Sequence, residues 1–372
     1  MRDILNKINN LEKIIGNTPL AEISFRYKGK KMKVYAKLEY YNYTGSIKDR
    51  IAIYILKKSY INNEITNDYT IMEATSGNTG ISFAAIGAYL GNKVNIFMPD
   101  WLSKERLKLL ESFNANVTLI SKKDGGFRKC IALTEKYASK YNDIYLPCQF
   151  SNIDNIYAHY YSTGPEIFND LDKIGLTPCA FVAGVGTGGT VMGVGKYLKE
   201  KNSNIKIYPL EPSNSPTLST GKHTHEHRIQ GISDEFIPPI LDLNFLDNII
   251  SVDDGDSIVM SQMLSRKFGL GVGISSGANF LGAIKVLELN DTTSTIVTIF
   301  ADDNKKYLST DLMKKEPIKN NFISSKVELL DLKIIWIKRL FHKWFKIYLW
   351  NSRILIDLLI KLPNFIKYNK YT

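Results

Sequence analysis

The sequence predicts an α/β protein built on open parallel sheets with helices on each side. Strand-like and helix-like runs alternate from residue 33 to about residue 300, which is the pattern that parallel sheets require. Most of the strand-like runs are nearly all apolar, as expected of strands covered on both faces. At 372 residues, with 44% hydrophobic and 23% charged residues, the chain can form one large or two medium globular domains.

The predicted elements follow one another in a regular order. The run "KVYAKLEY" predicts a strand and "IAIYILKKSY" a helix, and then "YTIMEA" and "KVNIFMP" each precede a helical pattern, "TGISFAAIGAYLG" and "KERLKLLESF". Four more apolar runs predict strands buried on both faces, namely "NVTLI", "CAFVAGV", "IKIYPLEP" and "STIVTIFADD". Residues 212–240 predict a long surface loop, a kind of segment that often carries function.

The last residues, 320–372, predict a basic amphipathic helical tail. The apolar stripe of this helix comprises Ile334, Ile337, Phe341, Trp344, Phe345 and Tyr348, and the basic stripe comprises Arg339, Lys343, Lys346 and Arg353. No stretch of about 18 uncharged apolar residues exists, so the tail does not span a bilayer. Two interpretations stay open for residues 326–362: a helix lying in a membrane interface, or helices packed on the body or on a partner subunit.

The net charge of +11 belongs mostly to this tail. Residues 326–372 hold ten Lys or Arg and three Asp or Glu, which is +7 and leaves +4 for the rest of the chain. No nucleic-acid motif accompanies the charge, so we expect no nucleic-acid partner. The N-terminus lacks a signal-peptide pattern, and Cys130, Cys148 and Cys179 have no metal-ligand spacing. We therefore expect buried thiols and a cytoplasmic protein, or one that is peripheral at the membrane through the tail.

A glycine-rich turn joins a strand to a helix in "VAGVGTGGTVMGVGKYL", residues 182–198. Backbone amides at a helix N-terminus bind phosphate, and glycine lets the anion approach the chain. Gly184, Gly186 and Gly189 also satisfy the dinucleotide pattern GxGxxG, with Glu211 about 20 residues further on. A dinucleotide-dependent oxidoreductase is therefore an alternative from this motif alone.

Two further features favour a different cofactor. Thr75, Ser76, Asn78 and Thr79 gather at a strand-to-helix junction, where their donors suit a carboxylate. Lys48 stands at the start of a helix, where the helix dipole disfavours a cation. A lysine amine becomes a nucleophile when its pKa is depressed or when its partner is a carbonyl. A phosphate cradle, a carboxylate nest and such a lysine together describe an amino acid joined to pyridoxal phosphate.

In these motifs the chain resembles the cysteine synthase and cystathionine β-synthase family of fold-type II pyridoxal-phosphate enzymes. The resemblance covers roughly residues 8–312 in unbroken order. It rests on "IGNTPL", "KLEYYNYTGSIKDRIA", "TSGNTGISFA", "PCQFSN", "TGPEI", "GVGTGGTVMGVGKYLKE", "HRIQGI", "GISSGAN" and "DDNKKYLSTDL".

The resemblance implies a role for each matching position. Lys48 is then the Schiff-base lysine and the base that takes the Cα proton of the substrate. Asn78 binds the phenolic oxygen of the cofactor, and Ser275 faces the pyridine nitrogen. The implied phosphate loop comprises Gly186, Thr187, Gly188, Gly189 and Thr190, and the implied substrate-carboxylate binders are Thr75, Ser76, Thr79 and Gln149.

The resemblance also implies the architecture: a fold of the tryptophan synthase β type with two open twisted α/β sheet domains and a C-terminal helical extension. The expected large cofactor-binding domain comprises residues 1–41 and 153–312, and the smaller mobile domain comprises residues 42–152. A homodimer is implied as well.

The implied reaction is β-replacement. A serine hydroxyl at position 275 favours a neutral pyridine ring, which favours loss of a β-leaving group to an aminoacrylate over transamination. The expected enzyme is a cysteine synthase, which converts O-acetylserine and sulfide into cysteine and acetate. The alternatives are a cysteine hydroxyl-lyase that releases sulfide and forms serine, a serine-using cystathionine β-synthase, and a non-catalytic membrane or partner scaffold.

One segment departs from the family pattern. After "HRIQGI" the chain continues with Ser233, Asp234 and Glu235, where cysteine synthases typically have glycine and alanine. We hypothesise that Asp234 orients or deprotonates a water or a serine hydroxyl, as a general base within hydrogen-bond reach does. A solvated acidic loop is the alternative. His223, His225 and His227 lack the geometry of a zinc site, so we expect no metal.

Overall fold

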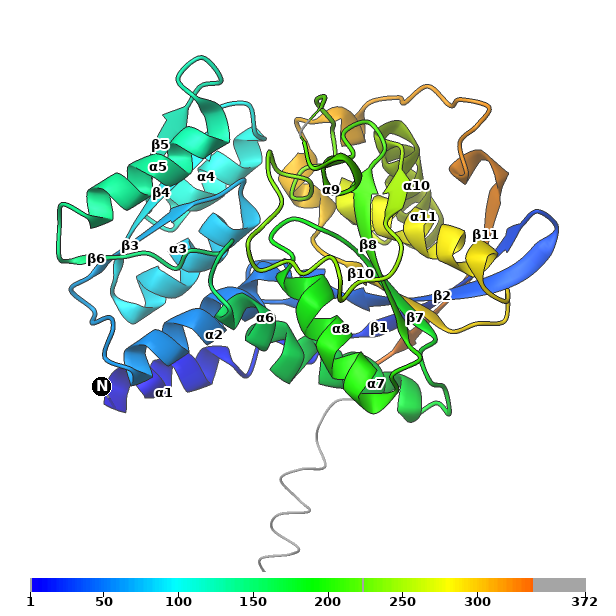
Figure 1. Cartoon of the computed structure of the whole chain (residues 1–372), viewed down its shortest axis with the longest axis horizontal. Coiled ribbons are helices and arrows are strands. Elements are labelled where there is room, and N and C mark those ends of the chain that lie inside the picture. The colour runs from blue at the N-terminus through cyan, green and yellow to red at the C-terminus, as the bar shows by residue number, and fades with distance from the viewer. Residues whose placement is uncertain (1, 223, 337–372) are drawn as a thin grey trace, which may run out of the picture. The chain divides into compact units, whose positions relative to one another are not determined.

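The computed structural model describes residues 2–222 and 224–336, and its strands form two sheets. The larger sheet has the order β11-β1-β2-β10-β7-β8-β9. Its strands are β1 (Leu20–Tyr27), β2 (Lys30–Leu38), β7 (Ala180–Gly184), β8 (Lys206–Pro212), β9 (Ile250–Val252), β10 (Ile296–Phe300) and β11 (Val327–Ile335). From β2 to β9 neighbouring strands are parallel, whereas β11, β1 and β2 pair antiparallel. Figure 1 shows this sheet and the smaller one side by side.

The smaller sheet is parallel throughout and has the order β5-β4-β3-β6. Its strands are β3 (Thr70–Ala74), β4 (Lys93–Pro99), β5 (Asn116–Ile120) and β6 (Ile144–Tyr145). The prediction that "NVTLI" is buried on both faces is wrong. This run is β5, an edge strand in which Leu119 is 45% exposed and Ile120 is buried. The prediction of domain boundaries at residues 41, 152 and 312 stays a prediction.

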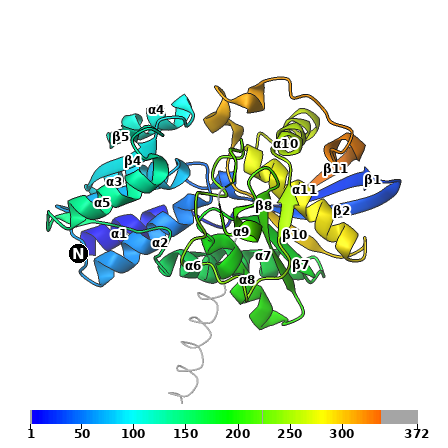
Figure 2. The same cartoon turned by 45° about the horizontal axis from the view of Figure 1, so that its top comes forward.

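Helices cover both faces of the larger sheet, as Figure 2 shows for α8 on one face and α10 and α11 on the other. The helices are α1 (Arg2–Leu11), α2 (Lys48–Ile61), α3 (Asn78–Leu90), α4 (Lys104–Ser112), α5 (Gly126–Ala138), α6 (Asp154–Ala158), α7 (Gly164–Asp172), α8 (Gly189–Lys201), α9 (Thr217–Thr220), α10 (Asp254–Phe268) and α11 (Ile274–Leu289). A π-helix, His159–Thr163, joins α6 to α7. Because α11 packs between α10 and the strands, its residues from Ile274 to Ile284 are all buried.

Local chemistry explains where these helices begin and end. The carboxylate of Asp253 accepts the N–H groups of Gly255 and Asp256, and so caps the start of α10. Gly91 ends α3 with φ +98° and Gly269 ends α10 with φ +68°, in the left-handed region that glycine adopts without strain.

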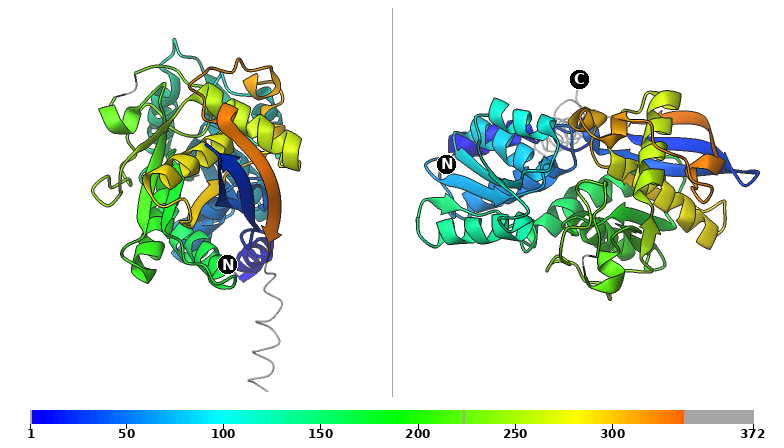
Figure 3. Two further views of the ribbon diagram at one scale, coloured as in Figure 1. Left: turned by 90° about the vertical axis from the view of Figure 1, so that its right-hand side faces the viewer. Right: turned by 90° about the horizontal axis from the view of Figure 1, so that it is seen from above.

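The prediction of a helical tail is wrong for residues 327–335. They form β11, which pairs antiparallel with β1, as the left view of Figure 3 shows. A register shift between Ser24 and Phe25 accommodates an irregular alternation in which Val327, Leu329 and Ile335 are buried. Pairing with a strand about 300 residues earlier therefore overrides the local helical pattern. The remainder of the predicted tail, residues 337–372, lies outside the described residues.

The structure also bears on the predictions about the cysteines and about membrane-spanning helices. Cys130 is buried as predicted, but Cys148 and Cys179 are exposed, so the prediction of three buried thiols is wrong. None of the helices in residues 2–222 and 224–336 is long and apolar enough to cross a membrane.

Candidate active site

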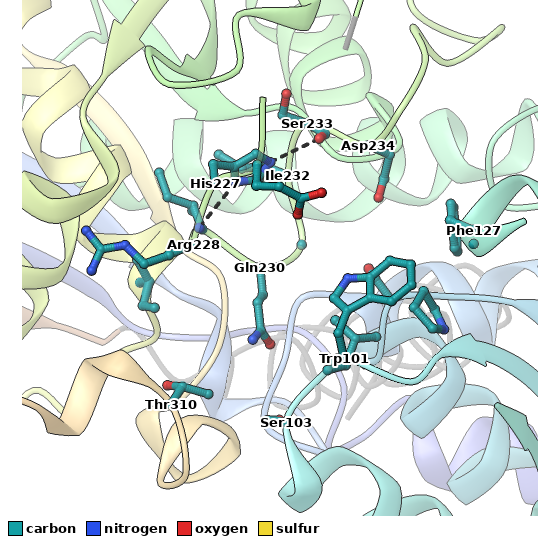
Figure 4. Close-up of a pocket in the computed structure, with 18 of the residues that line it drawn as sticks. Trp101, Ser103, Phe127, His227, Arg228, Gln230, Ile232, Ser233, Asp234 and Thr310 are labelled. Atoms are coloured by element: carbon teal, nitrogen blue, oxygen red, sulfur yellow. Dashed lines mark hydrogen bonds between the residues drawn. The ribbon is translucent and has the colours of Figure 1, made fainter. Parts of the chain in front are cut away.

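Two connected cavities hold most of the residues that the sequence singled out. The inner cavity is lined by Lys48, Ser76, Asn78, Thr79, Gln149, Gly186, Thr187, Gly188, Thr190, Asp234 and Ser275, among others. The outer cavity, of about 820 Å³, opens beside it. Ser76, Gln230 and Asp234 line both cavities. Figure 4 shows the outer cavity, with Gln230 and Asp234 extending from the 227–235 loop into it.

The turn that presents Lys48 is fastened to the end of β10. Ile47 donates its N–H to the carbonyl of Ala301 at 2.9 Å, and Lys306 donates to the carbonyl of Gly45 at 2.7 Å. Gly45 has φ +79°, and a Cβ there would lie 2.6 Å from a carboxylate oxygen of Asp303, so the turn requires glycine. These bonds fix the backbone of Lys48 at the first position of α2.

The buried carboxylate of Asp49, in the first turn of α2, supplies the negative charge that the helix dipole favours at this end. The unfavourable position of the neighbouring Lys48 is thereby offset. The carboxylate of Asp49 accepts the N–H and the hydroxyl of Thr44 at 2.7 and 2.6 Å, and the hydroxyl of Ser82 at 2.7 Å. The Lys48 amine, by contrast, makes no hydrogen bond or ion pair to any residue in the described part of the chain. Its amine is therefore available to the cavity.

Lys48 and Asp234 act on each other electrostatically. Burial lowers the pKa of the Lys48 amine to about 8, while the charge of Asp234 acts in the opposite direction. Burial likewise raises the pKa of Asp234 to about 6, with Lys48 opposing this shift and Glu235 adding to it. The site thus holds an amine and a carboxylate whose pKa values both approach neutrality, as proton-transfer groups require.

The glycine-rich turn follows β7 and opens α8 as predicted. A Cβ on Gly186 would lie 2.4 Å from the carbonyl oxygen of Gly231, and one on Gly189 would lie 1.9 Å from Oδ1 of Asn155. Within the described residues, the N–H groups of Gly186, Thr187 and Gly188 donate no hydrogen bond to another protein group. Free amides in a turn that excludes side chains form a cradle for a phosphate.

The position of Glu211 contradicts the dinucleotide alternative, in which this carboxylate would bind a ribose. This carboxylate is fully buried and accepts the N–H groups of Leu218 and Ser219, at 2.7 and 3.3 Å. It therefore holds the start of α9 rather than facing a ribose.

The polar turn before α3 divides its side chains between two tasks. Ser76, Asn78 and Thr79 line the inner cavity, whereas the hydroxyl of Thr75 accepts the N–H of Gly77 at 3.0 Å. Gly77 has φ +140°, and a Cβ there would lie 2.2 Å from the Arg106 side chain. Thr75 and Gly77 thus shape the turn that carries the other three residues.

Two of the predicted carboxylate binders also contact each other. The hydroxyl of Thr79 donates to Oε1 of Gln149 at 2.6 Å, and Nε2 of Gln149 donates to the carbonyl of Ala74 at 2.8 Å. The loop carrying Gln149 is held by the buried carboxyl group of Glu73, which accepts the N–H of Gln149 at 3.2 Å. Both side chains are therefore fixed before any ligand binds.

In the 233–235 segment only Asp234 reaches the inner cavity. The hydroxyl of Ser233 donates to the carbonyl of Ser215 at 3.0 Å, and Glu235 pairs with Arg128 at 3.6 Å. Among the described residues no group of three His, Cys, Asp or Glu side chains could hold a metal ion. The two ring nitrogens of His227 contact Ser233 and Ile229, and so brace this loop, as the dashed lines in Figure 4 show.

Four residues of the site were missed from the sequence: Arg106, Asn155, His159 and Asp302. Nδ2 of Asn155 donates to the hydroxyl of Thr187 at 2.9 Å, and Nε2 of His159 lies 3.2 Å from the hydroxyl of Thr190. Burial lowers the pKa of His159 well below its usual value, so the ring beside the glycine-rich turn is neutral. No local sequence signal marks these residues, because each reaches the site from another part of the chain.

Buried polar atoms without hydrogen-bond partners gather around the inner cavity. Five buried side-chain atoms lack a hydrogen-bond partner within the described residues, and four of them belong to Asn78, Arg106, Asn155 and Asp302. Asn78 and Arg106 line the inner cavity, and the other two contact its lining. Buried polar atoms without partners are costly. Three of these four atoms are acceptor oxygens, which a phosphate or a ring oxygen does not satisfy. The fit to pyridoxal phosphate therefore rests on the phosphate cradle and the uncommitted lysine.

Comparisons with known proteins agree with this geometry. A family model described as "Pyridoxal-phosphate dependent enzyme" matches residues 11–302. Cysteine synthase B of Campylobacter jejuni is 41% identical over 302 residues, which cover 81% of this chain and 97% of that protein.

Solved structures are similar over a still larger share of the chain. The crystal structure of a hydrogen sulfide-producing enzyme from Fusobacterium nucleatum has a TM-score of 0.87 at 54% identity and covers 90% of this chain and 100% of that chain. A hydrogen sulfide-producing enzyme with an aspartate-to-asparagine substitution, complexed with an α-aminoacrylate intermediate, has a TM-score of 0.88 at 54% identity. It covers 89% of this chain and 100% of that chain.

Proposed function

The chain belongs to the pyridoxal-phosphate dependent enzyme family, and from this premise we propose that it is a β-replacement enzyme of the cysteine synthase type. The proposed reaction converts O-acetylserine and sulfide into cysteine and acetate. The observation that carries it is the arrangement around the inner cavity, where Lys48 shares one lining with the glycine-rich turn and with Gln149. The likeness to cysteine synthase B over most of both chains supports this choice.

The residues present fit the cofactor at four points. The N–H groups of residues 186–190 would bind its phosphate, Asn78 its ring oxygen, Ser275 its ring nitrogen and Lys48 its aldehyde carbon. When bound, pyridoxal phosphate supplies an aldehyde that links to an amine and a ring that draws electrons from the substrate α-carbon.

The polar turn and Gln149 would orient the amino-acid substrate. Ser76 offers a hydroxyl donor and Gln149 the second hydrogen of its amide at one side of the inner cavity, and donors of this kind bind a carboxylate. The hydroxyl of Thr79 donates to Gln149 and so orients this amide. Because Thr79 and Gln149 already contact each other, little side-chain freedom remains to be lost when the substrate binds. Thr75 acts on this nest through Gly77.

Lys48 is the residue that moves the proton. Its lowered pKa, about 8, allows the amine to accept the α-proton of the substrate near neutral pH. The β-substituent then leaves with the bonding electrons, as acetate from O-acetylserine. A nucleophile adds at the β-carbon, and Lys48 returns the proton to the α-carbon.

Ser275 favours this route over transamination. It lies in the first turn of α11, lines the inner cavity and is 5% exposed. A hydroxyl there can donate to a neutral ring nitrogen, whereas a carboxylate would hold the nitrogen protonated. By keeping the ring nitrogen neutral, Ser275 would weaken the electron withdrawal that transamination needs, so departure of a β-leaving group would be favoured.

A second candidate function has a specific observation in its favour. Asp234 lines the inner cavity and has a pKa of about 6, and its negative charge raises the pKa of Lys48. A carboxylate at this place can take a proton from water, so that hydroxide replaces the thiol of cysteine and the products are serine and sulfide. The 54% identity to a hydrogen sulfide-producing enzyme supports this direction. No residue of the site separately favours the third alternative, cystathionine formation from serine.

One set of assays separates these reactions. The purified chain with bound cofactor is given O-acetylserine and sulfide, cysteine alone, or serine and homocysteine, and cysteine, sulfide, serine and cystathionine are quantified. If the enzyme is a cysteine synthase, we expect cysteine from the first mixture. If the second candidate function is correct, we expect cysteine alone to yield sulfide and serine in equal amounts. Absence of turnover in every mixture would contradict a β-replacement enzyme.

The assembly and the location stay predictions with their own tests. A homodimer would elute at twice the mass of the chain in sizing experiments with light scattering. A membrane role for the tail would be lost in a chain ending at Trp336, which keeps β11 paired with β1. If that shorter chain fractionates with membranes as the full chain does, the tail is not the membrane contact.

A further inference from the structure

The amide of Asn78 is held in one orientation by a buried carboxylate. Nδ2 of Asn78 donates to Oδ2 of Asp302 at 2.8 Å. Oδ1 of the same amide is buried and has no partner among the described residues. Asn78 as a whole is only half-buried and lines the inner cavity, so the part of its side chain that a ligand can reach lies on the nitrogen side.

Chemistry explains why the amide does not rotate. A carboxylate only accepts hydrogen bonds, so it pairs with the nitrogen of an amide and repels the oxygen. Rotation by 180° would leave Oδ1 unpaired and would also bring two acceptor oxygens together in a buried place. The unsatisfied Oδ1 is thus the smaller of two costs.

Asp302 itself is fixed from several sides. It is fully buried, and the hydroxyl of Tyr307 donates to its Oδ2 at 2.8 Å. The guanidinium of Arg106 lies 3.9 Å away and stacks on the Tyr307 ring at 4.6 Å. A Cβ on Gly273 would lie 2.1 Å from Oδ1 of Asp302, so the other oxygen rests against bare backbone.

We propose that Asp302 is a positioning residue that holds Asn78 as a hydrogen-bond donor to the ring oxygen of the cofactor. An amide nitrogen carries two hydrogens, and Asp302 takes one of them, which leaves the other for the ligand. A donor at an oxygen favours its negatively charged form. Asp302 therefore sets, through Asn78, the protonation of the cofactor ring oxygen. This inference rests on the proposed function, because it requires pyridoxal phosphate in the inner cavity.

The test compares variants of the protein with bound cofactor by visible absorption across a pH series and by the dissociation constant of pyridoxal phosphate. In Asp302→Leu the acceptor is lost and the amide is free to rotate. We expect the pH midpoint of the spectral change to rise by about one unit, which corresponds to about tenfold, and the dissociation constant to rise about tenfold. Asp302→Asn keeps one acceptor and should lie between the wild type and the leucine variant.

Two controls separate positioning from a structural role. Tyr307→Phe removes a neighbouring hydrogen bond but leaves the carboxylate beside Asn78, so the spectral midpoint should stay at its wild-type value. In an Asn78→Ala background, Asp302→Leu and Asp302→Asn should change the midpoint no further. A shift that is equal with and without Asn78, or no shift in either Asp302 variant, would overturn the inference while leaving the proposed function intact. A wild type that binds no pyridoxal phosphate would instead overturn the proposed function, and the inference with it.

Discussion

Asp234 and Lys48 line one cavity and titrate in each other's field, although they lie 186 positions apart in the sequence. Neither side chain forms a hydrogen bond or ion pair with any other residue that the structure describes. Burial brings both pKa values toward neutrality from opposite sides, to about 8 for the lysine and about 6 for the aspartate. The pair can therefore exchange protons with a substrate and a water near pH 7.

Replacing Asp234 with asparagine tests its role as a base. The carboxylate accepts a proton only in its charged form, so sulfide release from cysteine should rise with pH through about 6 in the wild type. In Asp234→Asn we expect the rate to fall by about 100-fold and this rise to disappear. Initial rates of sulfide release between pH 5 and pH 8 measure both effects. Glu235→Gln, at a residue that pairs with Arg128, is the matched control. The rise with pH should persist in this variant but move to lower pH, because the charge of Glu235 raises the pKa of Asp234.

The rate at which the apoprotein takes up pyridoxal phosphate should depend on the charge of Lys48. Only the neutral amine attacks an aldehyde, so uptake should rise with pH and level off above about 8. At pH 7 roughly a tenth of the amine is neutral, compared with roughly one part in 3000 for an ordinary lysine. Stopped-flow absorbance measures this rate. Because Asp234 raises the pKa of Lys48, Asp234→Asn should move the midpoint to lower pH, and a move to higher pH would contradict the electrostatic account.

Gly186→Ala should weaken cofactor binding. The added methyl group would lie 2.4 Å from the carbonyl oxygen of Gly231, so the turn must shift and its amides no longer converge on a phosphate. We expect the dissociation constant of pyridoxal phosphate to rise at least about tenfold in equilibrium dialysis. Gly175→Ala, with φ +74° and open space around it, should cost stability but leave this constant unchanged. Equal constants for both variants would show that the turn is not the phosphate site.

Arg50→Met should destabilise the fold strongly. Arg50 is 2% exposed and makes hydrogen bonds to Glu39 at 2.6 Å and to Glu166 at 2.8 Å, so its loss leaves two buried carboxylates with fewer partners. We expect the free energy of unfolding to fall by about 3–5 kcal/mol in urea titrations. Lys57→Met, in the same helix, removes a partly exposed ion pair with Glu12 and should cost less than about 1 kcal/mol. A smaller cost for Arg50 than for Lys57 would contradict this account.

The sequence predicted most strands because their evidence is local. Short apolar runs such as "YTIMEA" and "STIVTIFADD" coincide with β3 and β10, since a strand covered on both faces has few polar positions. β11 could not be predicted in this way. Its partner β1 lies about 300 residues earlier, and its nine residues match a helical stripe about as well as an alternating one. β5 was predicted with the wrong burial because edge position depends on the whole sheet.

The residues of the candidate site also differ in whether local sequence evidence could identify them. Lys48, Asn78 and the glycine-rich turn could be predicted because each places unusual residue types at a strand-to-helix junction. Arg106 and Asp302 could not be predicted. A lone arginine in a helix and an aspartate after a strand are ordinary until folding brings both beside Asn78. The hydroxyl of Thr75 was assigned to the substrate but is also needed by Gly77, which a sequence cannot reveal.

The most direct measurement of the central claim is the identity of the lysine that carries the cofactor. The protein with bound pyridoxal phosphate is reduced with borohydride and digested, and the modified peptide is identified by mass spectrometry. We predict that the label lies on Lys48, and that Lys48→Ala carries no label and loses at least about three orders of magnitude in turnover. A label on a different lysine such as Lys306, or full turnover by Lys48→Ala, would contradict the account.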